Sequence, residues 1–424
     1  MLNRKGGGNL AKVGMKLTPA LLIYVSIVLM RAANASFIVS LVAAFPSISA
    51  YMQGIIQASY SLTEAIFGIF AGIIYEYLGS FRSILLSSSL LFASYAAMVV
   101  FSSIEVGPQA FAVPSALAGL SASFLLTSSL AVISEETSKA SAKGRLFGVG
   151  GLEASNIIGY AVGFTFAGTI QLLFPSAAKN FSPSFFFSFL ALSSSALLSL
   201  SVRGEARERS RISLHVRTRV ERRVLKLVPM WLGFSIVMGV AFISPKFLNV
   251  LLSSMRGIAY SFHVNSGFIL LFALLILSAG VMGGSYIAGV IGKMNSLFIG
   301  SLSLSALLVT LSLFLKSHPL SGGEQVLYAA GISILGVLAL SVPPTLLSLL
   351  ADYTDASRIR GPSSGVYVTS MGIGIALGES MGGKIYDSFG LPFLLASLAL
   401  IFFPLSMGTW LMLRSEGRGR NLRR

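Results

Sequence analysis

Twelve apolar runs, each long enough to form a membrane-spanning helix, take up most of the 424 residues of the chain. An α-helix needs about 20 mainly apolar residues to cross the hydrocarbon core of a bilayer. Only 11% of the residues are charged, whereas soluble domains have about 25%. The sequence therefore predicts an all-α membrane protein with twelve transmembrane helices. The runs occupy residues 17–44, 52–76, 81–102, 108–134, 145–172, 184–202, 225–251, 262–290, 294–315, 325–351, 362–386 and 390–413.

Basic residues in the connections between the runs predict how the chain is oriented. Lys and Arg concentrate in the cytoplasmic loops of membrane proteins. Of the 31 Lys and Arg residues, 25 lie in the two terminal segments and the loops on their side, and 5 lie on the opposite side. We expect a protein of the cell (cytoplasmic) membrane with both termini in the cytoplasm. These loops explain the net charge of +16, so nucleic acid is not an expected partner.

A polar stretch at residues 203–224 divides the spans into six and six. It contains eight arginines and three glutamates, so it cannot enter lipid. The simplest interpretation is a solvated linker; a basic helix lying on anionic lipid headgroups is the alternative. The expected organisation is a cytoplasmic N-terminus (1–16), an N-terminal bundle (17–202), this linker, a C-terminal bundle (225–413) and a basic cytoplasmic tail (414–424).

The first apolar run also has features of a cleavable signal peptide. Basic residues precede it, and Ala33-Asn34-Ala35 is similar to a cleavage site. However, the run from Leu17 to Phe45 is too long for the apolar core of a signal peptide, and Arg31 lies inside it. We therefore expect an uncleaved first span.

An internal repeat relates the fifth span to the eleventh. When the chain is shifted by 215 residues, eight of the 24 positions at 145–168 are identical. Parallel repeats of this kind are typical of transporters that bind substrate between two halves near the middle of the membrane. The matched residues are Arg145, Gly150, Ser155, Ile158, Gly159, Ala161, Gly163 and Gly168, which fall on Arg360, Gly365, Ser370, Ile373, Gly374, Ala376, Gly378 and Gly383.

The loop after the second span carries a family signature. It has Gly72, an acid at Glu76, then Gly79 and a base at Arg82. This spacing resembles the loop between the second and third helices of the major facilitator superfamily, although Glu76 stands where the family usually has Asp. The basic turns that open the fifth and eleventh spans, with Arg145 and Arg360, are also similar to those of the family.

The resemblance implies two pseudo-symmetric six-helix bundles and transport by alternating access. It also implies that the residues of these loops form a cytoplasmic gate that holds the halves together when the protein faces outward. Two departures disfavour a drug/proton antiporter of the usual type. Ser115 stands where the family's fourth span often has Arg, and the segment from Gly159 to Phe164 lacks the family's antiporter proline.

Ionisable residues deep inside the first two spans are candidates for a transport site. Arg31 lies about 21 Å into the first span at 1.5 Å per residue, and Asn34 follows on the same face. Gln57, Tyr60 and Glu64 form one polar stripe on the second span. Glu64 lies about 18 Å into this span, measured from the opposite side of the membrane. Charges in the middle of a membrane usually face a cavity or a partner.

Two hypotheses remain open for this pair. In the first, Arg31 binds an anionic group of the solute while Glu64 carries a coupling proton, because burial favours the neutral form of an acid. In the second, Arg31 and Glu64 form a static pair that holds the helices together and binds nothing.

Three further polar residues complete the candidate site. Glu153 and Asn156 share a face of the fifth span, with Glu153 close to its cytoplasmic end. Glu379 replaces Phe164 in the repeat, and an acid present in only one half suggests a functional role. A structural pairing is an equally good interpretation of each.

Enzyme chemistry has little support in the sequence. The chain has no cysteine, and its three histidines, His215, His263 and His318, lack the spacing of metal ligands. No nucleophile motif or paired carboxylates are present in the sequence. We expect a protein that is not an enzyme and has neither a metal nor a cofactor.

The favoured function is secondary active transport of a small solute, with protons as the candidate coupling ion and a monomer as the expected state. Arg31 favours an organic anion or a zwitterion. Export of lipophilic compounds is an alternative, suggested by the 30 phenylalanines. A non-transporting sensor or scaffold on the same fold is another, and the retained Glu76 and Arg82 argue against it.

Overall fold

The computed structural model describes residues 19–136, 142–201, 222–242, 266–316, 322–357 and 361–421. These residues form helices joined by short turns, and no strand occurs among them. The expected N-terminal segment 1–16, residues 203–221 of the linker, Arg360 and the three histidines lie outside the described residues.

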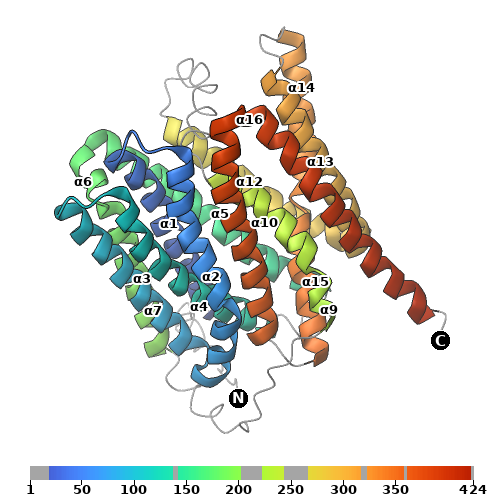
Figure 1. Ribbon diagram of the computed structural model, residues 1–424. Helices are drawn as coiled ribbons and strands as arrows, with labels where there is room; N and C mark the ends of the chain where they lie inside the picture. Colours follow the sequence, from blue (N-terminus) through green and yellow to red (C-terminus); the bar gives the residue numbers. More distant parts are fainter. Residues whose placement is uncertain are drawn as a thin grey trace, which may run out of the picture.

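The first half of the chain forms a bundle in which α1 packs on α5 and α7, α2 on α4, and α3 on α4 and α7. Figure 1 shows these helices together, in blue to green. The helices are α1 (Pro19–Ala44), α2 (Ala50–Leu78), α3 (Ser80–Ser103), the 3-10 turn η1 (Pro108–Phe111), α4 (Ala112–Glu136), α5 (Ala142–Leu173), α6 (Pro175–Lys179) and α7 (Ser182–Ser201).

The second half forms a bundle around α16, which packs against both α10 and α13, while α13 also packs on α14. These helices are drawn in yellow to red in Figure 1. They are α9 (Arg222–Leu225), α10 (Val228–Phe242), α12 (Ser266–Ile291), α13 (Lys293–Lys316), α14 (Gly322–Ala339), α15 (Val342–Ser357) and α16 (Gly361–Asn421).

Local sequence determines where the helices begin and end. Ser49 is the N-cap of α2, because its side-chain oxygen accepts a hydrogen bond from the Met52 N–H at 3.1 Å. Gly79 ends the same helix with φ 75°, and its N–H bonds to the Tyr75 carbonyl oxygen. Only glycine adopts this left-handed conformation without steric cost, which explains a glycine between α2 and α3.

Three predicted spans differ in shape from separate, uninterrupted helices. The tenth span is divided by a turn at residues 340–341, because Pro343 and Pro344 supply no N–H for the helical ladder and sit at the start of α15. The eleventh and twelfth spans are merged in α16, whose two limbs join at a bend in Figure 1. Gly390 makes this bend with φ 76°, and the second limb continues to Asn421, beyond the predicted end at 413.

The described helices account for the positions of all twelve predicted spans. Eight segments are long and apolar enough to cross a membrane. One of them, Gly361–Ser415, contains the last two predicted spans on either side of Gly390. The remaining spans correspond to shorter apolar helices at Ser182–Leu197, Val228–Val240 and Leu275–Ile291.

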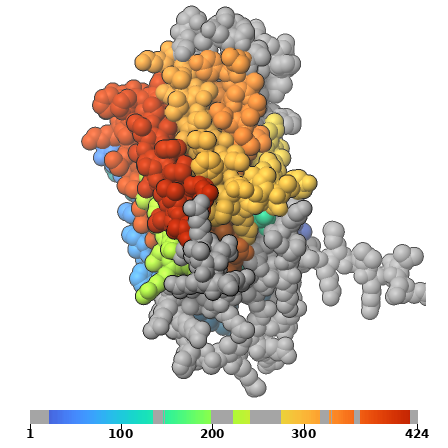
Figure 2. Space-filling view, turned by 90° about the vertical axis from the view of Figure 1, so that its right-hand side faces the viewer, coloured from blue at the N-terminus to red at the C-terminus, as the bar shows by residue number. Residues whose placement is uncertain are grey.

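The outer surface of the helices is apolar, as a lipid-facing surface must be. Figure 2 shows one face covered largely by the yellow, orange and red residues of the second half. Leu327 on α14 and Leu400 on α16 are 74% and 78% exposed, and Val113 and Ile276 are each 70% exposed. Surfaces this apolar are compatible with lipid and unfavourable in water.

The repeated glycines make equivalent contacts in the two halves. A Cβ atom on Gly159 of α5 would lie 2.6 Å from the Val28 carbonyl oxygen of α1. A Cβ on Gly374 of α16 would lie 2.7 Å from the Leu232 carbonyl oxygen of α10. Small residues allow helix backbones in membranes to approach this closely. The fifth and eleventh spans therefore pack in the same way on the first helix of their own half.

The two halves meet along two helix pairs, α2 with α16 and α5 with α12. In the first pair the helices run antiparallel, and a side chain at the small residues of α2 would strike the backbone of α16. The pairs in contact are Gly72 with Gly361, Gly68 with Gly365, and Gly54 with Glu379. Six of the candidate transport residues lie on helices of these pairs, and the other two, Arg31 and Asn34, lie on α1. The six are Gln57, Tyr60 and Glu64 on α2, Glu153 and Asn156 on α5, and Glu379 on α16.

Candidate functional site

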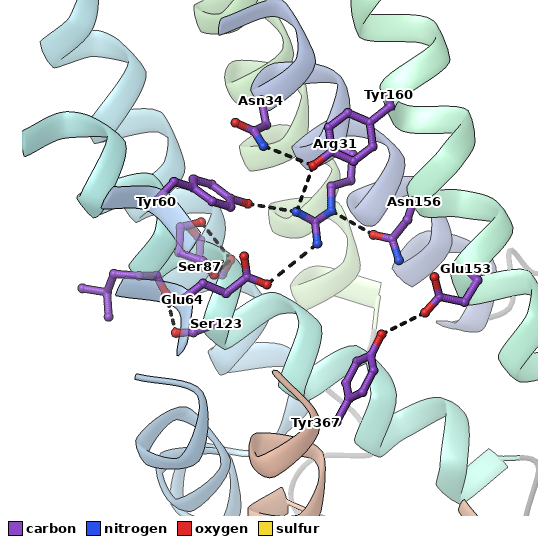
Figure 3. Close-up of polar contacts among 12 residues, drawn as sticks. Arg31, Asn34, Tyr60, Glu64, Ser87, Ser123, Glu153, Asn156, Tyr160 and Tyr367 are labelled. Carbon is purple, nitrogen blue, oxygen red and sulfur yellow. Dashed lines mark hydrogen bonds and ion pairs between the residues drawn. The ribbon is translucent and has the colours of Figure 1, made fainter. Parts of the chain in front are cut away.

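The guanidinium group of Arg31 is the centre of a buried polar network between α1, α2 and α5 (Figure 3). Its Nε donates to Asn156 Oδ1 at 2.9 Å, and its Nη1 donates to the hydroxyl oxygens of Tyr60 at 3.2 Å and Tyr160 at 3.5 Å. Asn34 also donates to the Tyr160 hydroxyl, at 3.3 Å. The planar fork of arginine, with five N–H groups, suits such a convergent set of acceptors.

Glu64 on α2 forms an ion pair with this guanidinium group. Its Oε1 lies 3.8 Å from Arg31 Nη2, and Glu64 is only 2% exposed. The separation is longer than a direct hydrogen bond, so the contact is electrostatic. The two residues predicted from their depth in the spans therefore do meet, and both line one cavity.

The cavity lies between the halves, since α1, α2 and α5 supply most of its wall and α16 supplies the rest. Six of the residues predicted from the sequence line it, and four others were not predicted. The predicted ones are Arg31, Asn34, Gln57, Tyr60, Glu64 and Glu379. The others are Ile38, Ser61, Tyr160 and Ile375.

Several polar atoms of the cavity wall are buried without a hydrogen-bond partner among the described residues. They are Oε2 of Glu64, Oε2 of Glu379, and both amide atoms of Gln57. Buried polar groups in folded proteins are nearly always hydrogen-bonded, so an unsatisfied cluster requires an explanation. The unsatisfied atoms make this cavity a candidate site for a polar ligand.

Glu153 lies outside the cavity lining and has a different contact. Its Oε1 accepts a hydrogen bond of 2.9 Å from the Tyr367 hydroxyl group, which joins α5 of the first half to α16 of the second. The ring of Tyr367 packs edge-on against Trp231 of α10, with centroids 5.3 Å apart. Figure 3 shows this pair apart from the Arg31 network.

A family model described as the Major Facilitator Superfamily matches residues 20–378. The chain belongs to the Major Facilitator Superfamily. This confirms the resemblance seen in the loop signature and the repeat, and with it the all-α, multi-pass membrane fold. As a member of this superfamily, the protein is a membrane transporter.

The solved structure of the human organic anion transporter MFSD10 (TETRAN) is similar in fold. It matches with a TM-score of 0.58 and 15% sequence identity, over 92% of this chain and 98% of the other. At this level of identity the match supports the superfamily fold alone. No curated protein matches the chain.

The superfamily loop signature lies where α2 meets the start of α16. Glu76 Oε1 accepts a hydrogen bond of 3.1 Å from the Gly361 N–H, at the N-terminus of α16. An anion at this end of a helix is stabilised by its exposed N–H groups and dipole. Gly72 makes close contact with Gly361, and Arg82 is exposed. The side chain of Arg145 lies outside the described residues, as does Arg360.

The opposite end of the same helix pair has a matching contact that the sequence interpretation missed. Asp387, near the end of the first limb of α16, accepts a hydrogen bond of 3.1 Å from the Tyr51 N–H through its Oδ2. Tyr51 lies in the first turn of α2. Each helix of this superfamily member thus places a carboxylate at the N-terminus of the other.

Proposed function

We propose that this superfamily member is a secondary transporter that moves a small organic anion or zwitterion across the cytoplasmic membrane by alternating access. The observation that supports this most directly is the buried guanidinium of Arg31 in a polar cavity between the halves. Charge at this depth is costly, about 2.5–3.5 kcal/mol or more, and is retained mainly where it binds or pairs. The structurally similar human protein MFSD10 is an organic anion transporter, which agrees with this substrate class.

Glu64 is the proposed carrier of a coupling proton. It lies beside Arg31, so a change in its protonation alters the charge that the solute meets. Protonation would release Arg31 from its ion pair and free a guanidinium nitrogen for an anionic group of the solute. Transport would move the solute without changing its chemistry, with both chain termini on the cytoplasmic side.

The test is solute flux into proteoliposomes, with and without a pH gradient, using labelled short carboxylates and amino acids. Flux of at least one solute should depend on the gradient, and should be lost when both charges are removed in the Arg31→Gln/Glu64→Gln double variant. Glu105→Gln is the matched control, because Glu105 is exposed in a loop. Unchanged flux in the double variant would refute the role of the pair, and binding without flux would favour a sensor.

A further inference from the structure

The basic and acidic sides of the cavity differ in how well their polar atoms are satisfied. Arg31 uses Nε and Nη1 for hydrogen bonds to Asn156 and two tyrosines, and Nη2 faces Glu64. By contrast, one carboxylate oxygen of Glu64 and one of Glu379 are buried without a partner in the described part of the chain. The unsatisfied atoms of the cavity are thus mainly acceptors, which require a donor rather than an anion.

The cavity wall also has more acidic than basic residues. Arg31 is its one base, and Glu64 and Glu379 are two acids, which are 2% and 5% exposed. The ion pair with Arg31 accounts for Glu64 and leaves Glu379 without a counter-charge among the cavity residues. A buried carboxylate without a cation is unfavourable in a membrane, so a further positive charge or a proton is needed here.

We infer that Glu64, Glu379 and Gln57 form a subsite for a protonated amine of the transported solute. An ammonium group has three N–H donors and no acceptor. The cavity offers three buried acceptors that have no partner among the described residues, namely Oε2 of each glutamate and Oε1 of Gln57. Transport of this solute rests on the function proposed above, but binding of the amine does not.

The subsite contains residues from both halves, because Gln57 and Glu64 belong to α2 and Glu379 belongs to α16. The backbone of Glu379 is held against α2 by its close contact with Gly54. An ammonium group bound here would link the two halves at the centre of the protein. In the proposed function a carboxylate binds Arg31 once Glu64 is protonated, and a protonated Glu64 keeps one acceptor oxygen for the ammonium group beside Glu379 and Gln57. The subsite therefore narrows the solute class from anion or zwitterion to zwitterion.

The test measures ligand-induced stabilisation of the purified full-length protein in detergent. The probes are primary amines, ω-amino acids and carboxylic acids that share the same carbon chain, from two to six carbons. At least one amino acid and its matching amine should raise the midpoint of thermal unfolding, while the matching carboxylic acid should raise it less. Equal stabilisation by the carboxylic acid, or no stabilisation by any amine, would overturn the inference.

Variants assign the binding to the subsite. Glu379→Gln should raise the apparent Kd of the amine-bearing probe about tenfold or more, since hydrogen bonds to charged groups are the strong ones. This variant should fold, because glutamine has the same shape and the change removes a buried charge that forms no ion pair with a described residue. Gln57→Leu provides a second test of the same subsite, and Glu105→Gln should bind like the unchanged protein. An unchanged Kd in both subsite variants would refute the assignment.

Flux measurements separate the two proposals. Binding of the amino acid without its transport into proteoliposomes would leave the subsite in place and refute the transport function. Transport of carboxylic acids that is insensitive to Glu379→Gln would leave the transport function in place and refute the amine subsite.

Discussion

Tyr367 donates a hydrogen bond of 2.9 Å to Glu153 and thereby joins the two halves of the transporter on one side of the central cavity. Tyr367 precedes Glu379 by twelve residues on α16, which places it about 18 Å nearer the start of that helix. The start of α16 is expected on the cytoplasmic side. The contact is therefore expected to lie between the cavity and the cytoplasm, and to break when the cavity opens to that side.

Replacing Tyr367 with Phe should favour the state that is open to the cytoplasm. The change keeps the ring but removes one hydrogen-bond donor of Glu153, the Tyr367 hydroxyl group, at an expected cost of about 1.5–3 kcal/mol in the closed state. The chain has no cysteine, so a single Ser285→Cys reporter can be used directly. Ser285 lies on α12 against Gly150, one turn from Glu153, and its labelling by a maleimide in inside-out vesicles should accelerate about tenfold or more.

The control for this prediction is the double variant Tyr367→Phe/Glu153→Gln. If the bond is the cause, Tyr367→Phe alone and the double variant should label at similar rates, because the hydroxyl donor of Tyr367 is absent in both. Independent, additive effects of the two changes would show that the bond does not hold the halves together.

The close contact between α2 and α16 predicts which glycines cannot be enlarged. A Cβ on Gly68 would lie 2.9 Å from the Thr369 backbone nitrogen and 3.0 Å from the Gly365 carbonyl oxygen. Gly68→Ala should therefore destabilise the protein by about 1–3 kcal/mol through overpacking. At Gly168 of α5, a Cβ would meet nothing within 4 Å, so Gly168→Ala should be neutral or stabilising by up to about 1 kcal/mol.

Thermal unfolding in detergent and proteoliposome flux would check the glycine prediction. Equal unfolding midpoints for Gly68→Ala and Gly168→Ala would mean that the helices separate at no cost, contrary to the observed packing.

Hydropathy, periodicity and buried charge were sufficient to predict the spans and six of the ten residues that line the cavity. Each span must satisfy its backbone hydrogen bonds within one helix, so its length and apolar composition are visible in a local window. Arg31, Glu64 and Glu379 were found for a related reason, because a charge inside an apolar run is expensive wherever its partner lies. Tyr160 was missed although it follows Asn156 by one turn, and this spacing could have indicated it.

The contacts between the halves could not be predicted from local patterns. Tyr367 has no charged residue three or four positions away that would mark its role, and its partner Glu153 is 214 residues away. The same holds for Asp387 and Tyr51, which are 336 residues apart. Such pairs depend on how two bundles meet, which neither span reveals alone. The interruption before Pro343 was not predicted either, but it could have been, because proline supplies no N–H for the helical hydrogen bonds.

The central ion pair of Arg31 with Glu64 and a more exposed ion pair should differ greatly in their effect on stability. Glu64→Gln leaves the buried guanidinium of Arg31 without its counter-ion, and loss of one partner of a buried pair typically costs about 3–5 kcal/mol. Lys293 and Asp352 form a pair whose side chains are 17% and 38% exposed. Removing it with Lys293→Gln should cost at most about 1 kcal/mol. Thermal unfolding in detergent would compare them, and a larger loss for Lys293→Gln would contradict the assignment of the central pair.

The carboxylates at the two ends of the α2–α16 pair should act as opposing latches. Glu76 holds the N–H of Gly361 at the expected cytoplasmic end, and Asp387 holds the N–H of Tyr51 at the other. Each contact should stabilise closure of its own end by about 0.3–1 kcal/mol. Glu76→Gln should therefore increase opening to the cytoplasm, and Asp387→Asn should increase opening to the outside, each about twofold to fivefold.

Cysteine labelling from each side would measure the two latches separately. Ser285→Cys reports on the cytoplasmic end, and Ala50→Cys, which lies against Gly383, reports on the outer end. Because closing one end favours opening of the other in alternating access, each variant should also slow labelling at the end it does not touch. Faster labelling at both ends in either variant would show that the carboxylate supports folding generally, rather than the balance between the two states.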